Sequence, residues 1–351
     1  ASPSPMTTEE SLSGMVTEEV EPGVYKVVND GVRDLASAVD RFRVDVTPDG
    51  SVWLSGPGDG QDLFRLGEER AFEGRMSWPP FRKVAPDGSL WSIGEIAPDG
   101  PWDGRGIFSF DGERWTARAT ATDNLSAVAV GPDGTVWAVA GDPDKHCPDR
   151  ADECRGTVLL RLEDDGSLTT IEDWADVHDG DAWLLGLAVS PDGDVWLVGQ
   201  GGETKGGTDL AGALLRFDGE GWEAIPGPEG WALGSSLASG PDGTLWVNAS
   251  DDVNRGEHDG THWLEGTLRG DPSGDVNRGE LARYDDAGWT TFTDADGVEP
   301  WGETSGFWAY RIPPTVAADG SLWLQSNYYQ ECRSDDDPEC GGRCGGAAHY
   351  D

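Results

Sequence analysis

The segment Gly131-Pro-Asp-Gly-Thr-Val-Trp137 is one of six versions of the same phrase, and these six decide the fold. Proline presets φ, aspartate bonds to its own backbone and glycine accepts a positive φ, so Pro-Asp-Gly marks a tight turn. The Val-Trp pair then starts a strand. The other versions lie at 47–53, 85–91, 190–196, 240–246 and 317–323, the last with Ala in place of Pro.

A four-strand pattern surrounds each phrase. An apolar run precedes the turn, as at 125–130, and the Trp-bearing strand follows it, as at 136–140. A third strand is predicted at 213–217, and a fourth follows a second Asp-Gly turn, as at 221–225. The chain has no sustained helical period. Repeated units of four short antiparallel strands predict an all-β fold, a six-bladed β-propeller with the repeat Trp buried between blades.

The two ends of the chain predict how the ring closes. Residues 23–35 look like third and fourth strands without a first and second, and 345–351 resemble a third strand. We expect the N-terminal strands to complete the last blade, which removes exposed strand edges. The prediction is one propeller domain over 22–351 after a flexible acidic tail over 1–21. A seven-bladed ring is the alternative, and the stop at Asp351 suggests that native sequence continues.

The repeat resembles a known type. The pattern Pro-Asp-Gly-x-(Val/Leu)-Trp, then Leu-(Leu/Ala)-Arg-(Phe/Tyr)-Asp and Gly-Trp-Thr, is similar to the two-component-regulator propeller repeat over about residues 22–351. That resemblance implies a bacterial extracellular sensor propeller. Related units occur in the streptogramin B lyase family, which places a catalytic His on a first strand. None of the five His of this chain lies on a predicted first strand, so that chemistry is not carried over.

The charge balance excludes several partners. The chain has 66 acidic and 25 basic residues, a net charge of −41. Nucleic-acid binding depends on Lys and Arg that neutralise phosphates, so nucleic acid is not an expected partner. No apolar run reaches the roughly 18 residues of a membrane span, and membrane insertion is not predicted. Seventeen Trp argue against a disordered chain.

The cysteines favour an extracellular or cell-surface protein. All five lie in polar, Gly- and Asp-rich segments, where disulfides are the expected use in an exported chain. Zinc is the alternative, although neither cluster has a clean Cys-x-x-Cys. One cysteine is left without a partner. The set is Cys147, Cys154, Cys332, Cys340 and Cys344.

Eight tryptophans fall outside the strand pattern, in the second-to-third loops and the connections between blades. Long insertions on one face of a repeat array usually mark its binding face. Trp faces interleaved with carboxylates suit a glycan, a peptide or a protein ligand. The alternative is that the same rings fold back as plugs over the ring. The predicted ligand-binding set is Trp78, Trp102, Trp174, Trp183, Trp231, Trp263, Trp301 and Trp308.

Signals for a metal and for catalysis are weaker. Asp335, Asp336 and Asp337 offer the hard oxygen ligands that Ca²⁺ prefers, so a structural calcium ion is a candidate cofactor. No nucleophile elbow, phosphate loop or His-Glu-x-x-His motif is present, and no catalytic residue is predicted. Function is therefore predicted as non-catalytic binding or sensing. The alternative is a glycan- or ester-directed hydrolase or lyase that uses carboxylates at the channel mouth, with or without a metal.

Overall fold

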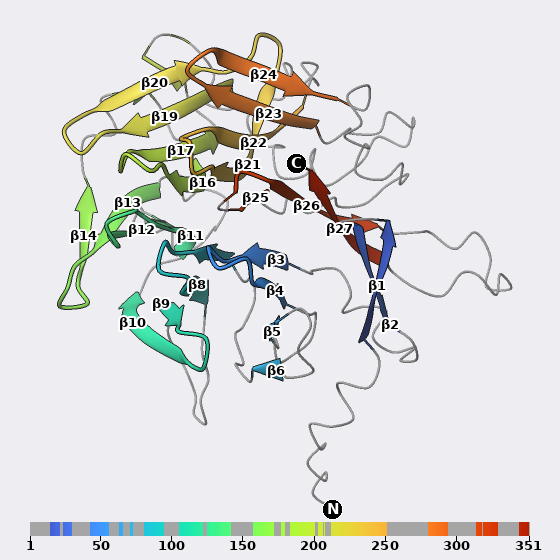
Figure 1. Ribbon diagram of the computed structural model, residues 1–351. Coiled ribbons are helices and arrows are strands. Elements are labelled where there is room, and N and C mark those ends of the chain that lie inside the picture. Colours follow the sequence, from blue (N-terminus) through green and yellow to red (C-terminus); the bar gives the residue numbers. More distant parts are fainter. Residues whose placement is uncertain are drawn as a thin grey trace, which may run out of the picture.

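The computed structural model describes a defined part of the chain, and every structural statement below concerns that part. The described residues are 15–21, 24–29, 43–55, 63–65, 71–72, 81–94, 105–121, 125–141, 157–171, 177–179, 183–200, 203–205, 207, 212–250, 280–293, 314–317, 319–328 and 344–350. Their regular structure is nearly all β (Figure 1). None of them forms a helix long and apolar enough to cross a membrane.

The first three antiparallel sheets have four strands each, in chain order. Sheet I contains β3 (Arg43–Val46), β4 (Val52–Ser55), β5 (Leu63–Arg65) and β6 (Ala71–Phe72). Sheet II contains β7 (Phe81–Val84), β8 (Leu90–Gly94), β9 (Arg105–Phe110) and β10 (Trp115–Ala121). Sheet III contains β11 (Leu125–Val130), β12 (Val136–Gly141), β13 (Thr157–Leu162) and β14 (Leu168–Ile171).

The next two sheets repeat the pattern and the last one adds a strand. Sheet IV contains β16 (Trp183–Val189), β17 (Val195–Gln200), β19 (Ala213–Phe217) and β20 (Trp222–Pro226). Sheet V contains β21 (Ala232–Ser239), β22 (Leu245–Ser250), β23 (Glu280–Asp285) and β24 (Gly288–Phe292). Sheet VI contains β25 (Thr315–Val316), β26 (Leu322–Tyr328), β27 (Cys344–Tyr350), β2 (Val24–Asn29) and β1 (Met15–Glu21).

The sheets close into a ring through their first strands. These strands contact one another in the order β3, β7, β11, β16, β21 and β25, and β25 contacts β3 again. Four-stranded antiparallel sheets that follow one another around an axis define a β-propeller. The fold class is therefore all-β propeller, as the repeats predict. The blade count of six stays a prediction for the chain as a whole.

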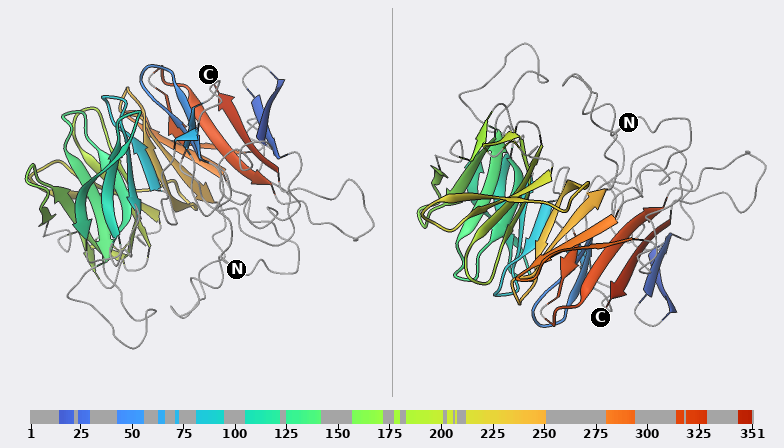
Figure 2. Two further views of the ribbon diagram at one scale, coloured as in Figure 1. Left: turned by 90° about the horizontal axis from the view of Figure 1, so that it is seen from below. Right: turned by 90° about the horizontal axis from the view of Figure 1, so that it is seen from above.

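Sheet VI combines both ends of the described chain. Strand β27 is its third strand, β2 pairs with β27, and β1 pairs with β2 at the outer edge. Figures 1 and 2 show β1 and β2 in dark blue beside the red C-terminal strands. The sequence pattern places strands at 23–35, whereas the described strand pair starts earlier, at Met15, within the segment for which a tail is predicted.

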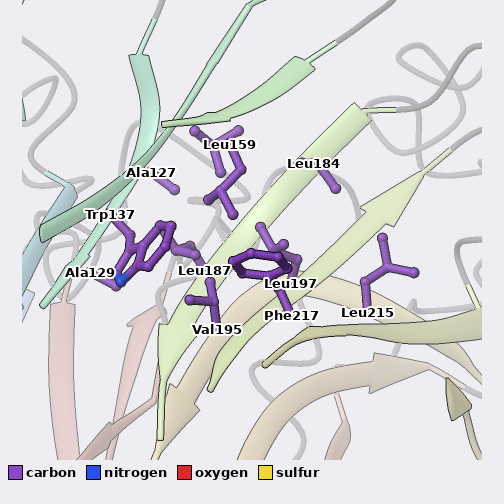
Figure 3. Packing of buried hydrophobic residues seen from close by; sticks show 11 residues of the cluster. Ala127, Ala129, Trp137, Leu159, Leu184, Leu187, Val195, Leu197, Leu215 and Phe217 are labelled. Atoms are coloured by element: carbon purple, nitrogen blue, oxygen red, sulfur yellow. The ribbon is translucent and has the colours of Figure 1, made fainter. Parts of the chain in front are cut away.

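The core lies between neighbouring sheets. Trp137 of sheet III reaches sheet IV, where its ring meets Phe217 edge to face at 6.0 Å between centroids (Figure 3). Leu159 and Leu197 in the same cluster have no exposed surface. Further clusters join sheets I and II, II and III, IV and V, and V and VI. Trp53, Trp137 and Trp196 are buried, which confirms that these repeat Trp are core residues.

Candidate functional site

The strand connections divide the ring into two faces. Every first strand joins its second strand through five residues, and we call this side the turn face. The second strand then runs to the opposite side, where segments of different lengths lead to the third strand: 142–156 in sheet III but 251–279 in sheet V. Connections to the next sheet, such as 172–182, start on that side too. We call it the loop face.

The six first-to-second turns on the turn face share one local geometry. Gly134 N donates to Gly131 O at 3.0 Å, Gly131 N donates to Thr135 O at 2.8 Å, and Gly134 has φ 85°. The Asp133 carboxylate accepts the backbone N–H of Thr135 at 2.9 Å. The same two backbone bonds close the turns at 47–51, 85–89, 190–194, 240–244 and 317–321. This is a tight turn that ends on a glycine in the left-handed region, as the phrase predicts.

These hydrogen bonds stabilise ionised aspartates. The hydroxyl of Thr47 and the N–H and hydroxyl of Ser51 lower the pKa of Asp49 to about 2, from an ordinary 3.8. Bonds from Thr135 lower the pKa of Asp133, and the Ser190 hydroxyl lowers that of Asp192. The aspartates of the turn face therefore bind their own turns, and their low pKa values have a structural cause.

On the loop face, a small sheet joins two kinds of connection. Strand β15 (His178–Asp179) lies between sheets III and IV in the sequence, and β18 (Glu203–Thr204) lies between β17 and β19. The two strands pair antiparallel, with His178 opposite Thr204, and Lys205 N donates to Val177 O at 3.0 Å. The sheet connection and the second-to-third segment of sheet IV therefore meet on one face.

Two of the eight predicted ligand-binding tryptophans lie in the described part of the chain. Trp231 is half-buried and packs against the cluster between sheets IV and V, so part of its ring serves as an anchor. Trp183 is the first residue of β16, opposite Gln200. The others lie outside the described residues: Trp78, Trp102, Trp174, Trp263, Trp301 and Trp308.

The predicted metal and disulfide residues are described for one position only. Cys344 begins β27, opposite Tyr328 of β26. Within the described part of the chain, no group of three His, Cys, Asp or Glu is placed to hold a metal ion. The remaining residues of these predictions lie outside it: Cys147, Cys154, Cys332, Cys340, Asp335, Asp336 and Asp337.

Six equivalent positions lie on the first strands of the six sheets, and two of them carry charged residues. Each position lies directly opposite a repeat Trp in the strand register. Sheets III, IV, V and VI carry small residues there, whereas sheets I and II carry an Asp and a Lys. We call this set the axial row: Asp45, Lys83, Ala129, Ala188, Ala238 and Thr315.

The two charged members of the axial row are both withdrawn from solvent, to different degrees. Asp45 is 1% exposed. Lys83 is half-buried, and its Nζ donates to the carbonyl oxygen of Leu237 at 2.7 Å. Leu237 belongs to β21 of sheet V, which is not a neighbour of sheet II in the ring. Neither residue belongs to a known sequence motif, but both stand out when the six repeats are aligned on their Trp.

Sheet IV carries a second polar cluster. Asp194 stands where the other five turns have Ser or Thr, and it is 8% exposed. Arg216 Nε donates to its Oδ2 at 2.6 Å, and the guanidinium lies over the Trp196 ring at 5.7 Å. The bond to Asp194 raises the pKa of Arg216. Both charges are paired, so this cluster is part of the blade's structure.

Comparisons with known proteins give no family. No family model matches the chain, and no curated protein matches it. Solved structures with a similar fold include a calcium-binding regucalcin from Agrobacterium tumefaciens. The two chains are 14% identical with a TM-score of 0.45, and the match covers 89% of this chain and 90% of the other.

Two further structures are similar to a comparable degree. TolB from Acinetobacter baumannii has 12% identity and TM-score 0.48, over 88% of this chain and 63% of the other. The extracellular domain of a proposed hybrid two-component system from B. thetaiotaomicron has 12% identity and a TM-score of 0.44. The match covers 91% of this chain and 38% of the other. At these values no activity, ligand or partner is transferred to this chain.

Proposed function

We propose that the protein is an exported, non-catalytic binding or sensor propeller of the two-component-regulator repeat type, whose loop face takes a glycan, peptide or protein ligand. One observation carries the proposal, the contrast between the two faces. The first-to-second turns on the turn face repeat one five-residue geometry, while the loop-face segments differ in length from sheet to sheet. Uniform parts of a repeat array serve its structure, and variable parts on one face serve recognition.

The composition of the loop-face segments supports such a surface. Trp102 belongs to the second-to-third segment of sheet II, and Trp263 to that of sheet V. Aromatic faces stack on sugar rings and attract cations. Cys147 and Cys154 lie in the corresponding segment of sheet III, and Cys332 and Cys340 in that of sheet VI. Disulfides there would hold long segments in place for a ligand.

Thermal unfolding with added ligands tests the proposal. Chelator-treated protein is heated alone, with Ca²⁺, with Mg²⁺, and with a panel of soluble glycans and peptides. We expect one glycan or peptide to raise the Tm of the wild-type protein. The rise should disappear in Trp102→Ala or Trp263→Ala and persist in Glu113→Gln, a control at an exposed position in the turn between β9 and β10.

The alternative functions give different results. Turnover of a glycan or ester that is abolished by one loop-face carboxylate substitution would replace the binding proposal with a hydrolase or lyase. A rise in Tm specific to Ca²⁺, lost when Asp335, Asp336 and Asp337 are replaced by Asn, would assign the calcium site. No shift with any glycan or peptide would contradict a small ligand and leave a protein partner to be sought.

A further inference from the structure

We propose that Lys83 is a tie across the propeller: its ammonium group, bound to the main chain of sheet V, fixes the separation of two sheets that do not neighbour each other in the ring. The inference concerns the ring itself and does not depend on the proposed function. It rests on the hydrogen bond from Lys83 Nζ to Leu237 O, at 2.7 Å.

This bond joins two sheets that are not neighbours in the ring. Sheet II contacts sheets I and III through the first strands, and sheet V contacts sheets IV and VI. In the order of these contacts β7 and β21 lie three steps apart, so the Lys83 side chain reaches the opposite side of the ring. A ring held only by neighbour contacts changes shape through small shifts between sheets, and a bond across the ring opposes such shifts.

The electrostatic setting favours a cation at this place. The chain has a net charge of −41, so the field over the whole molecule is negative. Asp45 occupies the same position of the axial row on β3, which contacts β7, and it is 1% exposed. A buried carboxylate requires a nearby positive charge or hydrogen-bond donors. Lys83, on the strand that contacts the strand of Asp45, therefore places a positive charge in an acidic molecule and supplies a donor to the opposite sheet.

Three other members of the axial row leave room for the tie. Ala129, Ala188 and Ala238 have short side chains and are buried, so none of them extends to the ring axis. A hydrogen bond from a charged donor to a carbonyl is stronger than a neutral one, because the acceptor also stabilises the charge. The tie is thus one directed bond between two sheets that do not neighbour each other in the ring.

Lysine acylation measures whether the amine is engaged in the wild-type protein. The chain has only four lysines, which are Lys26, Lys83, Lys145 and Lys205, so each can be followed by mass spectrometry. Lys205 is exposed and serves as the internal reference. We expect Lys83 to react about tenfold more slowly than Lys205, because its amine must first leave the Leu237 carbonyl. Equal rates would overturn the proposal.

Hydrogen exchange tests whether the bond acts across the ring. Lys83→Met keeps the length of the side chain and removes the ammonium, Lys83→Arg keeps the charge, and Lys205→Met is the matched control. We expect Lys83→Met to speed amide exchange in β21 (232–239) as well as in β7, with a smaller effect for Arg and none for the control. Faster exchange confined to β7 would mean a local role and contradict the tie. If Lys83→Met does not fold, the acylation rates decide.

Discussion

At the residue scale, the recurring aspartate binds to its own turn. Asp49 accepts the Thr47 hydroxyl at 2.5 Å and the Ser51 N–H at 3.0 Å, and the same backbone N–H bond forms at Asp87, Asp133 and Asp319. The carboxylate satisfies the backbone donor that follows the turn, which a neutral acid satisfies less well. The ionised form is thus part of the folded structure.

We therefore predict a loss of stability in acid. The folded-state pKa of Asp49 is about 2 against an ordinary 3.8, and the pKa values of Asp133, Asp192 and Asp242 are lowered too. A lowered pKa contributes stability above the ordinary value, and that stability is lost as pH falls from about 4 to about 2. Urea unfolding at a series of pH values should show this decline. Asp49→Asn should reduce it, and Asp286→Asn, at an exposed turn position, should not.

The ion pair of sheet IV gives a second prediction. Asp194→Ala leaves the half-buried guanidinium of Arg216 without the carboxylate that now lies at 2.6 Å. We expect the free energy of unfolding to fall by about 1–2 kcal/mol. Glu223→Gln is the control, because Glu223 is more exposed and lies 3.6 Å from Arg216. Its effect should stay below about 0.5 kcal/mol. Equal losses in the free energy of unfolding would show that the buried Asp194–Arg216 pair contributes no more to stability than the exposed Glu223.

At the element scale, the hairpin turn depends on a left-handed glycine. Gly134 has φ 85°, and no atom lies within 4 Å of the place where a Cβ would sit. A substitution there strains the backbone without a steric clash. Gly221 also has open space at its Cβ position but no positive φ. A comparison of alanine substitutions at the two glycines therefore distinguishes the cost of backbone strain from that of a new side-chain contact.

We predict that Gly134→Ala lowers the free energy of unfolding by about 1 kcal/mol. Gly221→Ala should be neutral or slightly stabilising, since alanine restricts the unfolded chain. Urea unfolding of both variants measures the difference. A destabilisation of the same size in Gly221→Ala would refute an origin in the left-handed conformation.

The sequence predicts those elements whose signal is local. The Pro-Asp-Gly-x-(Val/Leu)-Trp phrase contains its own turn chemistry and its own core residue, so all six first-to-second hairpins lie where it predicts them. Strand β1 (Met15–Glu21) has no such phrase in its sequence. It is held in place by its pairing with β2, which is a non-local signal. A strand that depends on a partner, with three Glu among its seven residues, is read easily as an acidic tail.

The candidate site was less accessible to prediction. Composition draws attention to the loop-face tryptophans, and of these Trp231 packs partly against the core. Asp45 and Lys83 carry no motif, and their meaning comes from a comparison with Ala129 and the other small residues at the same repeat position. Contact between opposite sheets is a property of the closed ring. A single repeat cannot reveal it.

At the scale of the whole molecule, charge opposes compactness. The chain has 66 acidic and 25 basic residues. The excess negative charges lie closer together in the folded ring than in the expanded chain, so they repel one another more strongly there. Turn-face carboxylates such as Asp49 and Asp133 are exposed, so dissolved ions can screen them. The molecule should therefore be sensitive to ionic strength over its whole surface.

We predict that the Tm rises as NaCl is added from low to high concentration, since screening weakens the repulsion. The rise should be similar with KCl, because it depends on ionic strength and not on a bound ion. Thermal unfolding followed by Trp fluorescence measures it. A Tm that is unchanged across the salt series would contradict net repulsion as a limit on stability.

The shared sheet of the two chain ends has a consequence for biosynthesis. Strand β2 pairs with β27, so β2 must wait for a strand that is made about 300 residues later in the chain. At ordinary rates of synthesis that delay is on the order of tens of seconds. During it, the free edge of β2 could attract other nascent chains. Because β1 lies along the other edge of β2 and carries three Glu, we expect like charges on every copy to oppose pairing between waiting chains.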